Sequence, residues 1–401
     1  MLALDELRLT DIDETRLNIV GEFCERVLNE NGLFPRILRT TDLPRALEGA
    51  EFVVTQIRAG KLEARIRDEK IPLEFGLIGQ ETTGIGGFVN ALRTIPQIEI
   101  IAKAVARYTP DAWLVNFANP SGIVTEFLLN HTPVKAVGLC NLPIGAQERI
   151  AKLLGLPMDQ VRLETVSLNH CGAITAVYVG GENVLPGLLH SDLLPAAAEQ
   201  DAWVANYLPI IELLGAIPND YLQYFFYRER KFNEFKNAPQ TRGEACRDIE
   251  ARLLSHYANE SNREVPAALA ERGGHLYSEA AIALIASLSG AAPGNHVVDV
   301  QNRGTIDFLP ETSVIETSCF VEQGCITRNP LTVTVNDVLR SLLTSVKAYE
   351  TLAVRAALTG DRATALQALA CNPITADLDK VAPCLTEMLE QNRSLLPRFF
   401  E

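Results

Sequence analysis

The 401-residue sequence lacks several features that mark specialised classes of protein. It has no apolar run of the roughly 18 residues that a membrane span needs. Its N-terminus, MLALDELRLTD, is acidic and has neither the basic region nor the apolar stretch of a secretory signal. Basic residues are in deficit, with 36 Lys and Arg against 50 Asp and Glu, so the net charge is −14. We therefore expect neither a membrane nor a nucleic acid as partner.

The eight cysteines lack a pattern as well, because they form no CxxC pair and no small-domain spacing. Without an export signal, we expect them to be reduced in the cytoplasm. Gly (26 residues) and Pro (21 residues) are near average usage, which excludes collagen-like and low-complexity chains. The remaining balance, 47% hydrophobic and 21% charged, is typical of a globular enzyme.

Short apolar segments alternate with helical patterns in the first half of the chain. Strands are predicted at 7–10, 36–40, 51–57, 112–117 and 134–139, and helices at 15–28, 43–47, 94–108, 122–130 and 145–154. Such alternation predicts a parallel sheet with right-handed crossovers, and places function at the carboxyl ends of the strands.

The pattern changes near residue 165. Strands are predicted there at 165–168, 175–179, 297–300 and 313–321, and helical segments at 191–270, 277–287, 338–358, 363–370 and 376–395. The sequence thus predicts an α/β protein with a Rossmann-like domain over residues 1–165 and an α+β domain over residues 166–401.

A dinucleotide-binding domain normally opens with a strand and a Gly-rich turn that approaches the pyrophosphate. No such turn precedes the first predicted strand, so we expect the usual first strand to be missing and the chain to be truncated at its N-terminus. Asp11, at the end of the first predicted strand, stands where a ribose-binding carboxylate belongs.

Two residues at predicted strand ends suggest a metal site. Cys140 ends one strand and His170 ends another, and a thiolate with a neutral imidazole can bind a divalent transition metal. Spacing alone leaves open the alternative of a buried cysteine and a hydrogen-bonded histidine.

Other polar residues allow both a functional and an ordinary interpretation. Asn119 could bind a sugar or ribose hydroxyl, or could cap the helix that follows it. Arg58 and Arg65 suit phosphate recognition, although basic side chains are more often simply solvated. The segment GQETTGIGGF (79–88), which contains Glu81, is rich in Gly and Thr. This composition suggests that its backbone approaches a ligand closely, although ordinary loops can have the same composition. Tyr277 could act as a base if a nearby cation lowered its pKa, or could be a packing residue.

Taken together, these segments resemble glycoside hydrolase family four, in particular its 6-phospho-β-glucosidase branch. The resemblance covers nearly the whole chain, and its motifs are long and occur in the same order. They are TQIRAGKLEARIRDEKIPLEFGLIGQETTGIGGF (55–88), ALRTIP (91–96), NFANPSGIVTE (116–126), GLCNLPIG (138–145), SLNH (167–170) and RGGHLYSEAA (272–281), and a weaker similarity continues through the second half to NRSLLP (392–397).

The resemblance implies a Rossmann-like domain followed by a domain similar to the C-terminal domain of lactate and malate dehydrogenases. It implies NAD and a divalent metal, usually Mn²⁺, as cofactors, and a phosphorylated glucoside or disaccharide as substrate. Oxidation of the sugar at C3 acidifies the C2 proton, a base removes that proton, and the C1 aglycone is expelled. Water then adds and the ketone is reduced. The family is an exception to two-carboxylate glycosidase chemistry.

The same resemblance assigns roles to individual residues. Cys140 and His170 match the metal ligands, and Tyr277 matches the base that takes the C2 proton. Glu81 matches a position thought to raise the basicity of that tyrosine.

Further positions match the binding residues of the family. Arg65, Asn119 and Asn141 are expected to bind the substrate, and Asp11, Gln56 and Arg58 are expected to bind NAD. Asn141 follows the metal-ligand cysteine as in β-acting members, whereas α-acting members have an aspartate there as general acid. We also expect a homo-oligomer, either a dimer or a tetramer.

Two departures from the family accompany the missing Gly-rich turn. Lys61 and Ser167 both occupy positions where the family usually has glycine. Two alternatives therefore stay open at this stage: a dehydrogenase of a 2-hydroxy acid, and a homologue that folds without turnover. The matching Cys140 argues against the dehydrogenase, which would need no cysteine ligand.

Overall fold

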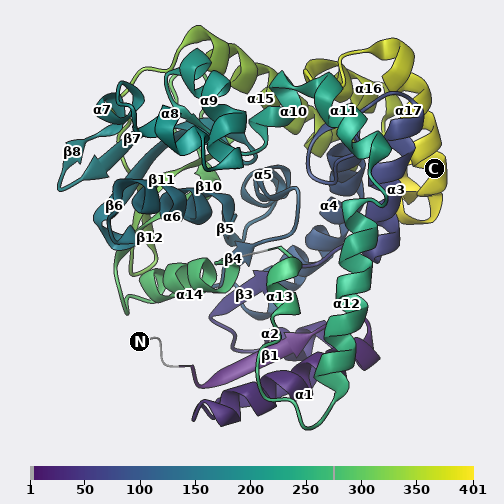
Figure 1. The fold of residues 1–401 in the computed structure, drawn as a ribbon. Helices are drawn as coiled ribbons and strands as arrows, with labels where there is room; N and C mark the ends of the chain where they lie inside the picture. Colours follow the sequence, from purple (N-terminus) through teal and green to yellow (C-terminus); the bar gives the residue numbers. More distant parts are fainter. Residues whose placement is uncertain (1–3, 274–275) are drawn as a thin grey trace.

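The computed structural model describes residues 4–273 and 276–401 and has an α/β architecture (Figure 1). The first two strands, β1 (Glu6–Thr10) and β2 (Arg36–Thr40), pair in parallel to form a two-stranded sheet of their own. Helices α1 (Glu14–Glu30) and α2 (Leu43–Leu47) connect and flank them. That the usual first strand is missing beside this pair remains a prediction.

A larger sheet of ten strands runs through the rest of the molecule. Its parallel part consists of β3 (Phe52–Thr55), β4 (Trp113–Asn116) and β5 (Lys135–Gly138). Its antiparallel part continues in the order β10 (Gly294–Gln301), β11 (Val314–Glu322), β6 (Val161–Leu168), β7 (Cys171–Val179) and β8 (Glu182–Asn183). Two short strands pair outside this order, β9 (Ile217–Pro218) with β7 and β12 (Cys325–Arg328) with β11.

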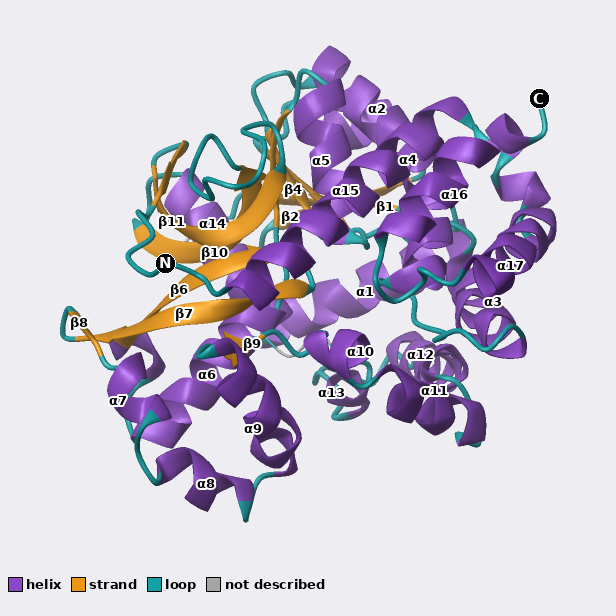
Figure 2. Cartoon of the chain, turned by 90° about the horizontal axis from the view of Figure 1, so that it is seen from above, coloured by secondary structure: helices purple, strands orange, loops and turns teal. Residues whose placement is uncertain are grey.

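The two parts of this sheet meet where Gly138 of β5 lies opposite Asp299 of β10. The sheet therefore crosses the boundary predicted near residue 165, although the division into two domains stays a prediction. Figure 2 shows the long antiparallel strands on one side and most helices gathered on the other.

Helices cover the sheet and supply most of the core. Those nearest the candidate site are α3 (Lys61–Glu74), α4 (Gly84–Tyr108), α5 (Ser121–His131), α6 (Leu142–Leu154), α12 (Arg242–Ala258), α14 (Tyr277–Leu288) and α15 (Asp337–Thr359). The others are α7 (Leu185–Leu189), α8 (Leu193–Ala198), α9 (Ala202–Leu214), α10 (Leu222–Phe226), α11 (Arg228–Asn237), α13 (Ala268–Glu271), α16 (Arg362–Cys371) and α17 (Leu378–Gln391). Short 3₁₀ turns occur at Met158–Gln160, Arg393–Leu395 and Pro397–Phe399.

Side-chain caps explain where several helices start. Asp13 accepts a hydrogen bond from the backbone N–H of Arg16 at the start of α1. Thr241 and Glu244 form a reciprocal capping box at the start of α12. Such caps satisfy backbone donors that have no partner inside the helix.

Two sequence predictions about helices were wrong. Residues 61–74 form α3, which was not predicted, because its buried face mixes the charged residues Arg65, Asp68 and Glu69 with apolar ones and so obscures the helical period in the sequence. Residues 84–88, expected to belong to a loop, are the first turn of α4. A Cβ at Gly86 would lie 2.3 Å from the Gln80 carbonyl oxygen, so glycine there permits the helix to pack against its own preceding loop.

Most of the other predicted elements overlap helices or strands of the structure, although α4 begins ten residues before the helix predicted at 94–108 and the helical segment predicted at 191–270 contains the short strand β9. The α/β fold class is confirmed. In the described part of the chain, no helix is both long and apolar enough to cross a membrane.

Candidate active site

Cys140 and His170 lie together at the carboxyl ends of two strands. Cys140 follows β5 and precedes α6, while His170 lies in the turn between β6 and β7 with a left-handed backbone (φ 64°). Both side chains are buried, and the Cys140 Sγ is 3.5 Å from the His170 Nε2. The structure thus brings together two residues that are 30 positions apart in sequence.

This separation fits a shared cation. Bonds of about 2.3 Å to sulfur and about 2.1 Å to nitrogen, meeting at a near-tetrahedral angle, hold the two ligand atoms roughly 3.5 Å apart. No cluster of three or more His, Cys, Asp or Glu side chains that could hold a metal occurs among the residues that the structure describes. The pair would therefore supply two ligands and leave other coordination positions open to a substrate.

Burial controls the protonation of both residues. It lowers the pKa of His170 to about 4, so the imidazole is neutral at pH 7 and able to bind a cation. Burial also raises the pKa of the Cys140 thiol, while hydrogen bonds from the Leu142 backbone N–H and the Asn169 side chain lower it. The thiolate form is thus favoured by two donors, but needs positive charge to outweigh burial.

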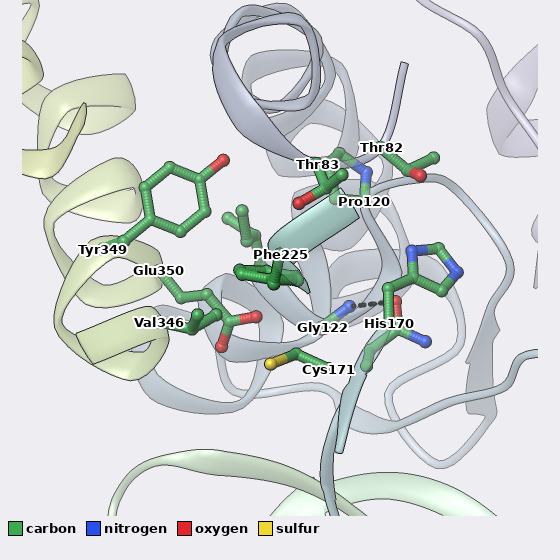
Figure 3. A pocket seen from close by; sticks show the side chains of 12 residues that line it. Thr82, Thr83, Pro120, Gly122, His170, Cys171, Phe225, Val346, Tyr349 and Glu350 are labelled. Carbon is green, nitrogen blue, oxygen red and sulfur yellow. Dashed lines mark hydrogen bonds between the residues drawn. The ribbon is translucent and has the colours of Figure 1, made fainter. Parts of the chain in front are cut away.

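An aromatic ring and a small cavity lie next to the His170 side chain. Tyr221 stacks on it, with ring centroids 4.1 Å apart and an interplanar angle of 5°. A cavity of about 20 Å³, enough for roughly one water molecule, lies beside it (Figure 3). The cavity is lined by residues of several elements, namely Thr82, Thr83, Pro120, Gly122, Ile123, Asn169, His170, Cys171, Phe225, Val346, Tyr349 and Glu350.

Glu81 is surrounded by arginines. Its carboxylate pairs with Arg58, and its Oε1 is 2.9 Å from the Arg65 Nη1. Burial opposes ionisation of Glu81, but Arg58 and Arg65 outweigh it and hold the pKa of the carboxyl below its usual value. Arg65 also donates to Glu69 at 2.8 Å. Arg58, Arg65 and Glu81, predicted separately to bind cofactor, bind substrate and support catalysis, therefore form one cluster.

Asn90 joins the Glu81 loop to the Asn119 loop. Its amide donates to the backbone carbonyls of Glu81 and Asn119, at 3.1 and 3.2 Å. The alternative that Asn119 caps the next helix is wrong, because α5 begins at Ser121 with Pro120 in the cap position and without a side-chain cap.

Tyr277 begins α14 and packs against Phe117, with ring centroids 5.2 Å apart. Burial raises the pKa of its phenol, and negative charge on Cys140, Tyr221 and Glu81 raises it further. Tyr277 thus lies close enough to Cys140 and Glu81 for their charges to affect its pKa. The Gly-Gly turn predicted before it includes Gly274, which lies outside the described residues.

The remaining predicted residues occupy other edges of the site. Asn141 precedes α6, next to Cys140, and Gln56 is exposed directly after β3. Asp11 directly follows β1 of the two-stranded sheet, whereas the Glu81 cluster follows β3 of the larger sheet. The Lys61 Nζ, 3.0 Å from the Asp13 Oδ2, links the start of α1 to the start of α3.

Several residues at the site were missed from sequence. These residues are Tyr221, Asn169 and Arg272. The sequence indicated only a helical pattern around Tyr221, a metal-ligand motif at Asn169 and a glycine turn after Arg272. The Arg272 Nη1 lies 3.5 Å from the Cys246 Sγ, and burial lowers its pKa, as do Arg58 and Arg65. The run SLNH was the available signal for Asn169, but nothing local marked Tyr221.

Two sequence profiles match the chain. The one described as family 4 glycosyl hydrolase matches residues 1–156, and the one described as the family 4 glycosyl hydrolase C-terminal domain matches residues 166–375. The chain belongs to glycosyl hydrolase family 4. This confirms the resemblance drawn from the sequence motifs.

Relatives of this family 4 chain include both β- and α-acting enzymes. It is 37% identical to a probable 6-phospho-beta-glucosidase of Bacillus subtilis (strain 168), covering 100% of this chain and 92% of that protein. The 6-phospho-beta glucosidase of Thermotoga maritima, solved with manganese, NAD⁺ and glucose-6-phosphate, superposes with a TM-score of 0.87 at 33% identity, covering 98% and 93% of the two chains. A 6-phospho-alpha-glucosidase from gut microorganisms, solved with NAD and Mn²⁺, gives a TM-score of 0.85 at 26% identity, covering 98% and 92%.

Proposed function

We propose that this family 4 chain hydrolyses 6-phospho-β-glucosides with the help of NAD and a divalent cation such as Mn²⁺. The observation that carries the proposal is the Cys140–His170 pair, 3.5 Å apart and adjoining the Glu81–arginine cluster. The β-acting relatives and the NAD, manganese and glucose-6-phosphate named for the Thermotoga enzyme support it. The homo-oligomer and the cytoplasmic location stay predictions.

Bound NAD and a divalent cation would supply reversible oxidation at C3 of the sugar, which makes the C2 proton acidic. The protein groups then divide the work. Cys140 and His170 would hold the cation, and Tyr277 would accept the C2 proton as the C1 aglycone leaves. Glu81 raises the pKa of Tyr277 by its negative charge and so increases the basicity of the phenolate.

Substrate and cofactor would bind on either side of the Glu81 carboxylate, which both Arg58 and Arg65 contact. Arg65 and Asn119 would bind the phosphorylated sugar, since guanidinium and amide groups suit phosphate and hydroxyl oxygens. Asp11, Gln56 and Arg58 would contact NAD. Because Arg58 and Arg65 share the Glu81 carboxylate, both arginines are held in place before any ligand arrives.

Asn141 supports β over α specificity. Its amide next to Cys140 cannot protonate a leaving group, whereas an aspartate at this position could. An α-linked substrate, whose aglycone leaves from the opposite face, would lack the acid found at this position in α-acting members.

The test is an assay of the purified chain with the two p-nitrophenyl 6-phosphoglucoside anomers, in the presence of NAD and Mn²⁺. We expect turnover of the β anomer in clear excess over the α anomer. A preference for the α anomer would contradict the β assignment, and turnover of neither anomer would favour the homologue without activity.

The variant Cys140→Ser tests metal binding separately from the preference for one anomer. It leaves Asn141 and the arginine cluster unchanged but replaces the thiolate by a poorly ligating hydroxyl. We expect it to lose turnover of both anomers together, and equal turnover of variant and parent would remove Cys140 from the metal site.

A further inference from the structure

Tyr221 covers one face of the His170 ring. The two ring centroids are 4.1 Å apart and the rings are nearly parallel, at an angle of 5°. Within the part of the chain that the structure describes, no group hydrogen-bonds the buried Nδ1 of His170. Histidines that bind a metal are usually oriented by a hydrogen bond on their second ring nitrogen. For His170, the stack with Tyr221 is therefore the described contact best placed to fix the plane of the ring.

The backbone before Tyr221 is anchored on β7. The Asn219 N–H donates at 2.9 Å to the carbonyl of Gly172, which lies two residues after His170. The Asn219 Oδ1 in turn accepts from the Tyr221 N–H at 2.9 Å. These bonds bring Tyr221 to the turn that carries His170.

Asp220 is held by two helices. Its Oδ1 accepts hydrogen bonds from the Arg149 Nη2 of α6 at 2.8 Å and from the Trp203 Nε1 of α9 at 2.9 Å. The Arg149 guanidinium also lies over the Trp203 ring, 4.6 Å from its centroid. The backbone carbonyl of Asp220 accepts from the Tyr207 hydroxyl and, at 3.0 Å, from the Gln223 amide. We call Arg149, Trp203 and Asp220 the clamp.

The clamp relates both candidate metal ligands to α6. This helix begins two residues after Cys140 and carries Arg149 about two turns further on. Asp220, to which Arg149 donates, directly precedes the Tyr221 that stacks on His170. Figure 2 shows α6 and α9 together below the long strands β6 and β7. The helix that follows one ligand thus also fixes the ring that covers the other.

We propose that Asp220 is a positioning residue of the metal site: through the clamp it holds the Tyr221 ring flat on His170 and so keeps the His170 Nε2 directed at the shared cation. This inference rests on the proposed function, because it concerns the same Cys140–His170 pair. It goes beyond that function by giving a role to three residues outside the predicted ligands.

The experiment compares two substitutions of Asp220. Asp220→Ala removes the acceptor for both helices. Asp220→Asn keeps it, because both bonds end on the same oxygen, Oδ1, which an asparagine side chain also has. The control for a general loss of stability is Asn336→Ala. Asn336 donates to the Leu213 and Leu214 carbonyls at the end of α9, so this variant should loosen α9 without removing the clamp.

The first measurement is the NMR signal of the His170 ring protons in metal-free protein with labelled histidine. Protons stacked on the face of an aromatic ring are shifted upfield, and the signal is assigned by its absence from His170→Gln. We expect Asp220→Ala to move this signal downfield, towards its position in Tyr221→Leu. Asp220→Asn and Asn336→Ala should keep the signal of the parent.

The second measurement is Mn²⁺ affinity by electron paramagnetic resonance. We expect Asp220→Ala to bind Mn²⁺ roughly 10–100-fold more weakly than the parent, the usual effect of removing support around a metal ligand. Asp220→Asn and the control should stay near the parent. Thermal unfolding of each protein shows whether it folds. If Asp220→Ala does not fold, the double variant Arg149→Met with Trp203→Phe removes the same two donors and should change the ring signal and the affinity alike.

The outcomes separate this inference from the proposed function. A His170 signal that is unchanged in Asp220→Ala would overturn the inference alone, and so would a moved signal with the parent's Mn²⁺ affinity. If Asp220→Asn behaves like Asp220→Ala, the clamp does not act through its acceptor and the inference is wrong. A parent that binds no Mn²⁺ would overturn the proposed function, and with it the role of the clamp in metal binding.

Discussion

At the scale of single residues, burial sets the charge of the groups at the site. The pKa of His170 is lowered to about 4, whereas burial raises the pKa of Cys140 and of Tyr277. The imidazole is therefore ready to bind a cation at neutral pH, but the thiol and the phenol retain their protons. A cation between them would supply the positive charge that both need. That Tyr277 requires such a cation to act as a base stays a prediction.

Tyr277→Phe tests the role of the phenol. If Tyr277 accepts the C2 proton, we expect kcat to fall by roughly 10²–10⁴, the usual contribution of a general base. Binding of the substrate should change little. The measurement is the loss of deuterium from substrate labelled at C2, which the parent should exchange with water and the variant should not.

The control for this variant is Tyr221→Phe, which keeps the ring that stacks on His170 and also removes one buried hydroxyl. We expect it to retain deuterium exchange. Normal exchange by the Tyr277 variant would exclude Tyr277 as the base.

At the scale of elements, two helices near the site are joined by a cluster of buried charged side chains. On α15, the Lys347 Nζ lies 2.6 Å from the Glu126 Oε2 of α5 and 2.5 Å from the Glu350 Oε2, and all three side chains are buried. Burial raises the pKa of Glu350 to about 7, while Lys347 lowers it. This triad joins α15 to α5, the helix that follows the Asn119 loop.

Lys347→Met should destabilise the protein by about 3–5 kcal/mol, because it leaves buried carboxylates without their cation. The measurement is the free energy of unfolding in urea. Lys103→Met is the matched control, since Lys103 is 74% exposed and its pair with Glu99 joins two residues of α4. We expect this control to change stability by at most about 1 kcal/mol. Equal effects of the two substitutions would show that the buried triad contributes no more to the free energy of unfolding than an exposed ion pair does.

At the scale of the whole molecule, the C-terminal NRSLLP segment reaches back to the first half of the chain. The Asn392 Oδ1 accepts from Arg93 at 3.2 Å and from Arg67 at 3.3 Å, and the Arg93 guanidinium also pairs with Asp68. Leu395 borders the same region, since a Cβ at Gly60 would lie 2.8 Å from the Leu395 Cδ1. The end of the chain thus braces α3, the helix that carries Arg65.

Asn392→Ala should cost about 1–3 kcal/mol of stability, because it removes an acceptor from the buried guanidinium of Arg93 and the half-buried one of Arg67. Gln391→Ala is the control, because this neighbouring side chain is exposed and donates to Glu387 within α17. We expect the control to stay within about 0.5 kcal/mol of the parent. Urea unfolding measures both, and no loss in the Asn392 variant would show that the segment does not brace α3.

Sequence reasoning went furthest where the signal is local. The β-branched run at 51–57 and the amphipathic pattern at 145–154 predicted elements that the structure contains as β3 and α6. Cys140 and His170 were found because both follow apolar strands. It failed at α3, whose buried charges conceal the helical period, and at Tyr221, whose partner His170 lies far earlier in the chain.

By itself, the sequence determined the α/β class, the order of the elements and the family, because periodicity and long motifs are properties of neighbouring residues. Only the tertiary structure decided which polar groups share a site. Glu316 meets Asn169, Glu81 meets Arg58 and Arg65, and each contact depends on strands and helices that pair across the fold. The physical reason is that a polar contact controls the charge and the orientation of a side chain strongly only when that side chain is buried. Burial arises only once segments distant in the sequence have packed together.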